Sequence, residues 1–314
     1  MTLRLNHKDR EIIWQRELQP VVKKRNRNIE PEKKKINAMV HTNNDGYPLM
    51  DKSFVGSRKN QTAWIFGSGV SLNEIETWGI PEGVVTIALN GGVVWFWDFE
   101  KKCFRRKLDY WMTFDRRVLN HRQLPEWDYA QMALNNPHTK KFIFEHIHCP
   151  SGFKNVHKFH LRKRNSHDKV FTKFHDEHLI TGDSILTPAL HFCYIAGFKR
   201  IFLSGVDMCC FKGKGKVERY CNQLSGMRHQ GHHIQPMGSP KIAPNGEKVR
   251  VMTMYDRQIN QIMPEIRFLQ DSGIEVIKTS LRGMLPINAL DTERTLNAIV
   301  KGESVNYKKG NGKA

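Results

Sequence analysis

Short apolar runs alternate with amphipathic segments along most of the chain. Six runs predict buried strands, because each is short and almost continuously apolar: 62–67, 83–90, 108–115, 140–147, 200–207 and 273–280. Two helices are predicted between the later runs, over 184–197 and 255–273, with Gly197 placed to end the first. Strands of this length linked by helices indicate an α/β fold, a doubly wound and mostly parallel sheet.

Four segments stand outside this alternation. Residues 1–60 are basic and punctuated by proline, and we expect either a solvated arm or an arm that lies along a phosphate backbone. Residues 148–180 mix cations with phenylalanine, as an ordinary basic insert or as one that stacks on bases. Residues 208–250 form a long glycine-rich stretch, typical of a lid, and 291–314 form a tail. The catalytic domain is therefore predicted over 61–290.

Composition adds a preference for a polyanionic partner. The 314 residues include 50 Lys and Arg against 31 Asp and Glu, which leaves a net charge of +19. Such a balance favours nucleic acid or an anionic membrane surface. We find neither a spanning apolar run nor the apolar core of a signal peptide, so we expect a cytoplasmic protein. The six cysteines include no C-x-x-C pair, which favours free thiols over a metal site.

The candidate chemistry lies where strands end. In an open parallel sheet a ligand binds beyond the carboxyl ends of the strands, at the switch in strand order. The first predicted strand ends in the glycine-rich stretch Gly67–Ser71, either a phosphate cradle or a turn whose glycines serve packing. Other strands end in Asn90, in Asp115 followed by Arg116 and Arg117, and in Asp207.

Taken together these motifs resemble a known family. WIFGSGVSL, VVTIALNGG, DYWMTFDRR and TGDSILTPALHFCYIAGFKRIFLSGVDM follow one another as in the bacterial sialyltransferases of glycosyltransferase family 42 and their relatives. Those relatives include the family of the archaeal 6-hydroxymethylpterin diphosphokinase and many phage proteins. The resemblance covers about 62–207, with a weaker echo over 255–280. It implies a Rossmann-like, GT-A-like domain that binds a nucleotide-sugar donor.

The resemblance also assigns residues to the donor site. Those that match nucleotide- or donor-binding positions are Gly67, Ser68, Gly69, Ser71, Asn90, Thr181, Gly182, Asp183, Ser184 and Asp207. For Asp207, a structural role that anchors the turn is an equal alternative. Asp115 is a candidate to hold a sugar hydroxyl or a metal ion, or simply to cap the following turn.

The family's catalytic base is a histidine of the lid, which suits proton transfer near neutral pH. Here the lid offers His233 and His232 as candidates, with a polar loop role or a zinc site with Cys221 as alternatives. Cations that could contact phosphate or nucleic acid are Arg116, Arg117, Arg162, Lys163, Arg164 and Arg228. No metal ligand is assigned, and the need for a divalent metal stays open.

We therefore expect a nucleotide-sugar-dependent glycosyltransferase. The basic segments favour nucleic acid as acceptor, namely DNA with a hydroxymethylated base as in phage-type modification, and a base inside a duplex would have to be flipped out. Three alternatives remain: a surface-glycan sialyltransferase-like enzyme, a pyrophosphate transferase with Mg²⁺ at Asp115 or Asp207, and a nucleic-acid-binding module without catalysis. The sequence leaves the sugar, the nucleotide and the oligomeric state open.

Overall fold

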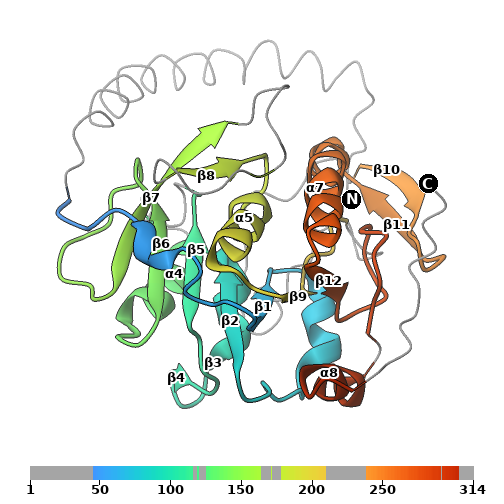
Figure 1. The fold of residues 1–314 in the computed structure, drawn as a ribbon, viewed down its shortest axis with the longest axis horizontal. Coiled ribbons are helices and arrows are strands. Elements are labelled where there is room, and N and C mark those ends of the chain that lie inside the picture. The colour runs from blue at the N-terminus through green and yellow to red at the C-terminus, as the bar shows by residue number, and fades with distance from the viewer. Residues whose placement is uncertain are drawn as a thin grey trace, which may run out of the picture. The chain divides into compact units, whose positions relative to one another are not determined.

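An eight-stranded parallel sheet lies at the centre of the fold (Figure 1). The computed structural model describes residues 45–115, 119, 125–163, 171, 178–209, 238–290 and 292–303. The chain divides into two units, 1–44 and 45–314, and only the second contains described residues. The predicted arm over 1–44 and most of the predicted lid, 210–237, therefore lie outside the described residues.

The strand order in the sheet is β12-β9-β1-β2-β5-β6-β7-β8, and all neighbouring strands are parallel. The strands are β1 (Thr62–Phe66), β2 (Val84–Leu89), β5 (Tyr110–Thr113), β6 (Lys140–Phe144), β7 (Val156–Lys163), β8 (His178–Thr181), β9 (Arg200–Ser204) and β12 (Glu275–Lys278). The predicted α/β, Rossmann-like fold with a parallel sheet is confirmed, as are all six predicted strands.

Both predicted helices are present as α5 (Leu186–Ala196) and α7 (Thr253–Asp271). Gly197 ends α5 with a φ of +85°, a left-handed conformation that glycine adopts without strain. Pro264 lies inside α7 and does not end the helix. In the described part of the chain, no helix is both long and apolar enough to cross a membrane.

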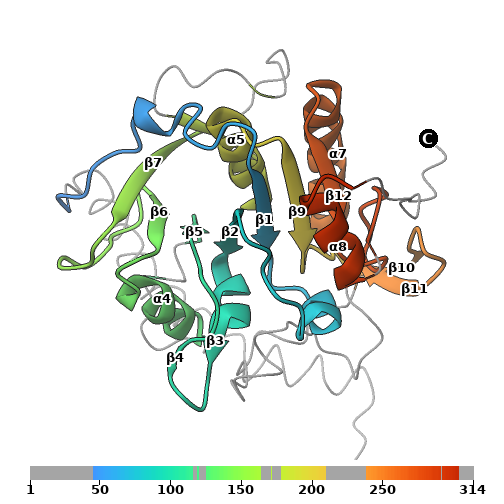
Figure 2. The same cartoon turned by 60° about the horizontal axis from the view of Figure 1, so that its bottom comes forward.

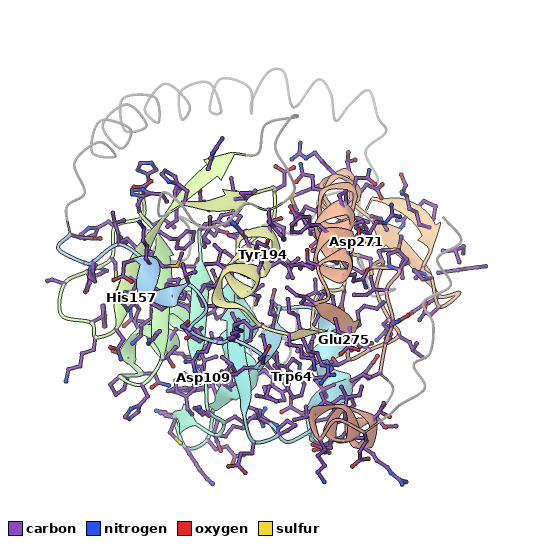
Figure 3. The ribbon with its side chains drawn as sticks, in the orientation of Figure 1. Trp64, Asp109, His157, Tyr194, Asp271 and Glu275 are labelled. Carbon is purple, nitrogen blue, oxygen red and sulfur yellow. The ribbon has the colours of Figure 1, made fainter. Side chains whose placement is uncertain are left out.

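Each face of the sheet carries its own apolar core. Alternate residues of β1 point to opposite faces, so Ile65 joins the core under α5 and α7, whereas Trp64 and Phe66 join the other core. That second face is covered by η3 (Val70–Ile75), η4 (Asn90–Phe96), α4 (Pro125–Asn135) and α8 (Glu293–Val300). Figure 2 shows α5 and α7 on one side of the sheet and α4 on the other, and Figure 3 places Trp64 in the sheet and Tyr194 on α5.

The sheet includes two strands that the sequence pattern did not predict. β7 and β8 lie in 148–180, which we expected to be an insert, but they extend the sheet beyond β6. The polar side chains of β7 (Val156–Lys163) interrupt the apolar pattern that would predict a strand. In the fold these side chains have specific partners. The imidazole of His160 contacts the Glu145 carboxylate and stacks on His178 with ring centroids 4.9 Å apart.

The ends of the predicted catalytic domain also differ from the described structure. Residues 45–60, predicted as arm, pack on the sheet, where Met50 and Phe54 are buried in the core beneath α5. In the predicted tail, α8 buries Leu296 and Ile299. Within the predicted lid, the described residues form an antiparallel hairpin of β10 (Ser239–Ile242) and β11 (Lys248–Val251). The folded part of the chain is therefore longer than 61–290.

A buried ion pair ties residue 45 to β7. The Lys158 Nζ lies 2.6 Å from the Asp45 Oδ2, with the two side chains only 4% and 6% exposed. The same ammonium donates to the Ile147 carbonyl, and the Cys149 N–H donates to the Asp45 carboxylate over 3.1 Å. Each buried charge thus has both an opposite charge and a hydrogen bond, which offsets much of its desolvation penalty.

We expect Asp45→Ala to lower the free energy of unfolding by about 3–5 kcal/mol, because it leaves the Lys158 ammonium buried without its counter-charge. Urea unfolding followed by circular dichroism measures this change. Glu82→Ala, at an exposed position, is the control and should change stability by less than about 0.5 kcal/mol. The double variant Asp45→Leu with Lys158→Met should recover most of the loss. An Asp45→Ala effect as small as that of the control would contradict this account.

Candidate functional site

The switch in strand order lies between β1 and β9. From β1 the chain continues to β2 on one side, whereas from β9 it continues to β12 on the other. Connections that leave in opposite directions open a crevice between the carboxyl ends of the two strands, which is where ligands bind in such sheets. The turn Gly67–Gly69 follows β1 and the turn Gly205–Asp207 follows β9 at this crevice. The structure thus brings two of the predicted motifs together.

The two turns pack against each other backbone to backbone. The Gly67 N–H donates to the Ser204 carbonyl over 2.7 Å, and the Gly69 N–H donates to the Gly205 carbonyl over 2.8 Å. A Cβ atom on Gly67 would lie 2.3 Å from the Gly205 carbonyl oxygen, and one on Gly69 would lie 2.4 Å from Asp207 Oδ2. The packing role accounts for both glycines. Ser68, half-buried between them, is the side chain of this turn that a ligand could contact.

Ser71 and Asp207 lock the two turns together. Both side chains are buried, and the Asp207 carboxylate accepts hydrogen bonds from the Ser71 hydroxyl and, over 3.1 Å, from the Ser71 N–H. Burial raises the pKa of Asp207, although the two hydrogen bonds from Ser71 oppose the shift. The Ser71 donors are therefore committed to Asp207. Of the alternatives for Asp207, this geometry supports the structural anchor.

Asn90, the first residue of η4, holds the most unusual position at this edge of the sheet. Its φ is +47°, in the left-handed region that a residue with a side chain rarely adopts. Its side-chain oxygen is buried and has no hydrogen-bond partner among the described residues. Its carbonyl accepts a hydrogen bond from the Trp111 indole over 2.9 Å. Backbone strain and an unpaired buried acceptor together are typical of a ligand-binding position.

Close backbone packing places Asn90 beside the first glycine turn. A Cβ atom on Gly92 would lie 2.2 Å from the Phe66 carbonyl oxygen and 2.7 Å from that of Gly67. Only glycine at this position allows η4 to approach the end of β1 so closely. The start of η4, which begins at Asn90, therefore lies against the turn that contains Ser68.

The turn between β8 and α5 is held by α7. The Asp183 carboxylate pairs with the Arg257 guanidinium and accepts a hydrogen bond from the Gln261 amide over 3.2 Å. The Gln258 amide donates to the Asp183 carbonyl over 2.7 Å. The Ser184 hydroxyl accepts from the Leu186 N–H over 3.2 Å at the start of α5. These contacts are structural, and donor binding by this turn stays a prediction.

The remaining residues of the turn are also engaged locally. The Thr181 hydroxyl donates to the Gly182 carbonyl over 2.9 Å, and a Cβ atom on Gly182 would lie 2.8 Å from the Gln261 side-chain oxygen. Asp115 is half-buried just beyond β5, and its N–H donates to the Thr113 hydroxyl over 3.3 Å. That contact involves the backbone of Asp115 and not its carboxylate, so the turn-capping, sugar-binding and metal-binding alternatives all remain predictions.

Of the six cations predicted to contact phosphate or nucleic acid, two lie in the described part of the chain. Arg162 is exposed on β7 and Lys163 is the last residue of that strand. The candidates outside the described residues are Arg116, Arg117, Arg164, Arg228, His232 and His233. In the part of the chain that is described, no three histidine, cysteine, aspartate or glutamate side chains are grouped to hold a metal ion.

Sequence reasoning missed two cations near Asp207. Lys278, the last residue of β12, is buried, and its Nζ donates to the Arg282 carbonyl over 3.2 Å. Burial lowers the pKa of Lys278 to about 8, although the charge of Asp207 opposes the shift. The Arg282 guanidinium pairs with Glu247 over 2.8 Å. The only sequence signal was a lysine that ends an apolar strand at the carboxyl edge.

No protein-family model and no curated protein match the sequence. Among solved structures, the chain is similar to the MAf glycosyltransferase from Magnetospirillum magneticum AMB-1, with a TM-score of 0.51 and 11% sequence identity. The match covers 84% of this chain and 37% of that one. The likeness shows the fold. It does not single out glycosyltransferase family 42.

The pKa of Lys278 predicts how stability depends on pH. Between about pH 8 and pH 10.5 the unfolded lysine binds more protons than the folded one, so the wild-type free energy of unfolding rises with pH. Lys278→Met removes this contribution. We expect the stability difference between wild type and variant to shift in favour of wild type across that window.

Other groups that titrate in this range, including Lys141, are present in both proteins, so their contributions cancel in the difference. Lys248→Met, at an exposed position on β11, is the control for removing a lysine. Guanidinium unfolding at several pH values measures both variants. A constant difference for Lys278→Met would show that the amine titrates alike in the folded and unfolded states.

Proposed function

We propose that this protein is a glycosyltransferase that takes its sugar from a nucleotide-sugar donor. The likeness in fold to the MAf glycosyltransferase supports the class of reaction. Asn90 is the observation that carries the proposal, because its unpaired buried oxygen lies at the carboxyl edge of the sheet, next to the switch point. A hydroxyl or amino group of the donor that hydrogen-bonds to this oxygen would remove the cost of leaving it unsatisfied.

Two cations near the switch point could contact the phosphates of an anionic donor. Asp207 is buried behind the first turn, where both its oxygens accept hydrogen bonds from Ser71. Lys278 and Arg282 both lie close enough to lower the pKa of this carboxyl group. Arg282 also pairs with Glu247 over 2.8 Å and lies 3.7 Å from Glu74, so a donor phosphate would share these cations with carboxylates. Charge fixed in advance is also what stabilises a leaving phosphate as a glycosidic bond breaks.

For the acceptor we propose nucleic acid that carries a hydroxymethylated base. The net charge of +19 supports a polyanionic acceptor, since cations that neutralise phosphates supply most of the affinity for nucleic acid. Arg162, exposed on β7, is one of the cations that could contact such a strand. The hydroxyl of the modified base would be the nucleophile, after its proton passes to a general base. The family resemblance implies that the general base is His233 or His232.

Asn90→Gly tests the donor site without adding backbone strain, because glycine adopts a positive φ freely. We expect at least tenfold weaker binding of the donor, with little loss of thermal stability. Calorimetric titration with CMP, UDP, GDP and ADP sugars identifies the donor in the wild type and then measures the variant. Asn60→Gly is the matched control, since Asn60 also has a positive φ, of +64°, but is exposed. Equal donor affinity in Asn90→Gly and wild type would rule out this role for Asn90.

His233→Ala tests the catalytic base. We expect transfer to hydroxymethylated DNA to slow by roughly 10²–10⁴-fold, the usual contribution of general acid–base catalysis, while donor affinity stays unchanged. Single-turnover transfer of a radiolabelled sugar measures the rate, and His229→Ala controls for losing a histidine from the same segment. Full activity in His233→Ala would move the assignment to His232.

A further inference from the structure

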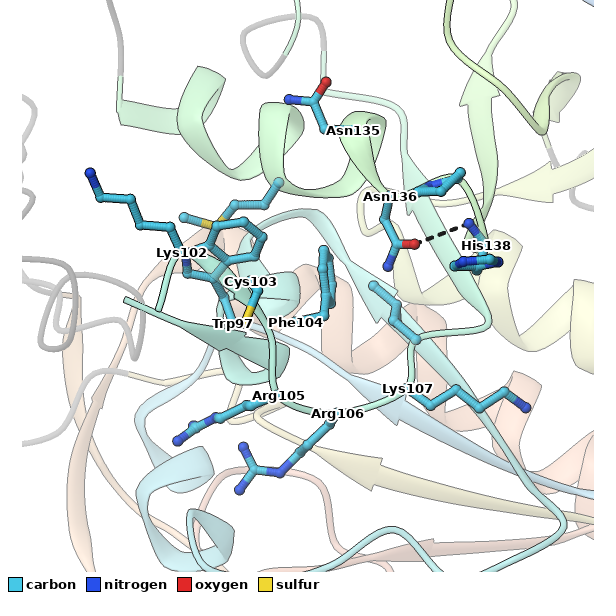
Figure 4. A pocket seen from close by; sticks show the side chains of 13 residues that line it. Trp97, Lys102, Cys103, Phe104, Arg105, Arg106, Lys107, Asn135, Asn136 and His138 are labelled. Atoms are coloured by element: carbon cyan, nitrogen blue, oxygen red, sulfur yellow. Dashed lines mark hydrogen bonds between the residues drawn. The ribbon is translucent and has the colours of Figure 1, made fainter. Parts of the chain in front are cut away.

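A cavity lies at the edge of the sheet opposite the switch point. It has a volume of about 830 Å³ and is formed by the β3–β4 hairpin, the segment that leads into β5 and the end of α4 (Figure 4). The hairpin consists of β3 (Trp97–Asp98) and β4 (Cys103–Phe104). Residues 105–108 precede β5 and residues 135–138 precede β6, so this hairpin cavity lies at the amino edge, opposite Asn90. Its volume is in the range of small-molecule sites.

The hairpin cavity is positively charged. Lys102, Arg105, Arg106 and Lys107 line it, and no acidic residue of the described chain does. Lys102 and Lys107 are exposed, although Lys107 also pairs with Asp109 over 2.8 Å. A cavity with this lining favours an anion.

Its two arginines are fixed in place. The Arg105 guanidinium pairs with Glu76, and the Arg106 guanidinium lies 3.8 Å from the centre of the Trp95 ring and donates to the Trp95 carbonyl over 2.9 Å. Burial lowers the pKa of Arg106 to about 10, which leaves it charged at neutral pH. The segment 105–107 is thereby held rigidly where the cavity opens, so little entropy is lost when a ligand binds to it.

The hairpin adds aromatic surface. Trp97 and Phe104 face each other across β3 and β4, with ring centroids 5.2 Å apart and planes at 89°. Both are only half-buried, so part of each ring remains accessible. In Figure 4 the Phe104 ring lies between Trp97 on one side and Asn136 with His138 on the other. Accessible rings beside cations are the combination that binds a nucleobase with its phosphate.

We propose that the hairpin cavity binds a nucleotide unit, with the base on Phe104 and Trp97 and its phosphate near Lys102 or, on the opposite side of the cavity (Figure 4), near Lys107. The unit comes either from a free nucleoside monophosphate or from a single-stranded polynucleotide, which share this chemistry. The site goes beyond the proposed transferase function, because it stands whether or not the chain transfers a sugar.

Fluorescence anisotropy of labelled deoxythymidine decamer, with competition by unlabelled thymidine monophosphate and by inorganic phosphate, tests the proposal on the full chain. Phe104→Leu keeps an apolar side chain but removes the ring, and should weaken binding about tenfold or more. Lys102→Gln with Lys107→Gln should lower the slope of log affinity against log salt by roughly 1.4 for the decamer, about 0.7 for each lost phosphate contact.

The control variant Lys248→Gln with Arg250→Gln removes the same charge from exposed positions on β11 and should leave the slope nearly unchanged. Melting temperatures confirm that each variant folds. Competition by the monophosphate assigns a free nucleotide as the source, whereas binding of the decamer alone assigns a polynucleotide.

Three results would overturn the site: wild-type affinity in Phe104→Leu, equal competition by inorganic phosphate, or loss of binding in Asn90→Gly with none in Phe104→Leu. The last outcome would place the nucleotide in the proposed donor site instead. Loss in Phe104→Leu with none in Asn90→Gly supports the hairpin cavity even if no sugar is transferred.

Discussion

Asp207 accepts hydrogen bonds from both the hydroxyl and the N–H of Ser71, and the architecture of the carboxyl edge depends on this contact. It fastens the turn after β1 to the turn after β9, the two strands between which the order reverses. A carboxylate buried this deeply loses its hydration, so it requires these donors and the nearby charge of Lys278. With the turns fixed, η4 can pack on the end of β1 and hold Asn90 in its left-handed conformation.

A strand could be predicted from the sequence when it is apolar throughout, but not when it contains polar side chains whose partners are distant in the sequence. β1, β2 and β9 are buried on both faces, so their sequences are nearly continuous apolar runs that can be recognised without knowing any contact. β7 is also a sheet strand, but it contains the buried Lys158, whose charge is compensated by Asp45. Asp45 is close to Lys158 in space but far from it in the sequence. A pattern of polarity cannot contain that information.

In the candidate site, too, features of the local sequence could be predicted, whereas contacts between distant segments could not. Sequence indicated that strands end in glycine turns and in Asn90, and the structure places those ends at one edge. It could not indicate that the glycine at 67 is required by the Gly205 carbonyl, since that contact joins distant segments. Nor could it separate Lys278 from the solvated lysines, because only burial distinguishes it. The hairpin cavity was not predicted, because the rule for ligand binding in open sheets considers the carboxyl edge alone.

The two edges are connected by β5. Lys107 lies before this strand at the hairpin cavity and Asp115 lies after it, near the proposed donor site. At about 3.3 Å per residue, the eight steps from residue 107 to residue 115 span at most roughly 26 Å. That is about eight nucleotides of stacked strand at roughly 3.4 Å each. Because β5 is buried, a strand that reaches both sites must follow the surface and be longer than this. A free nucleotide can occupy only one of the two sites, whereas such a polynucleotide can reach both, so binding at the hairpin cavity would raise the effective concentration of a polymeric acceptor at the carboxyl edge.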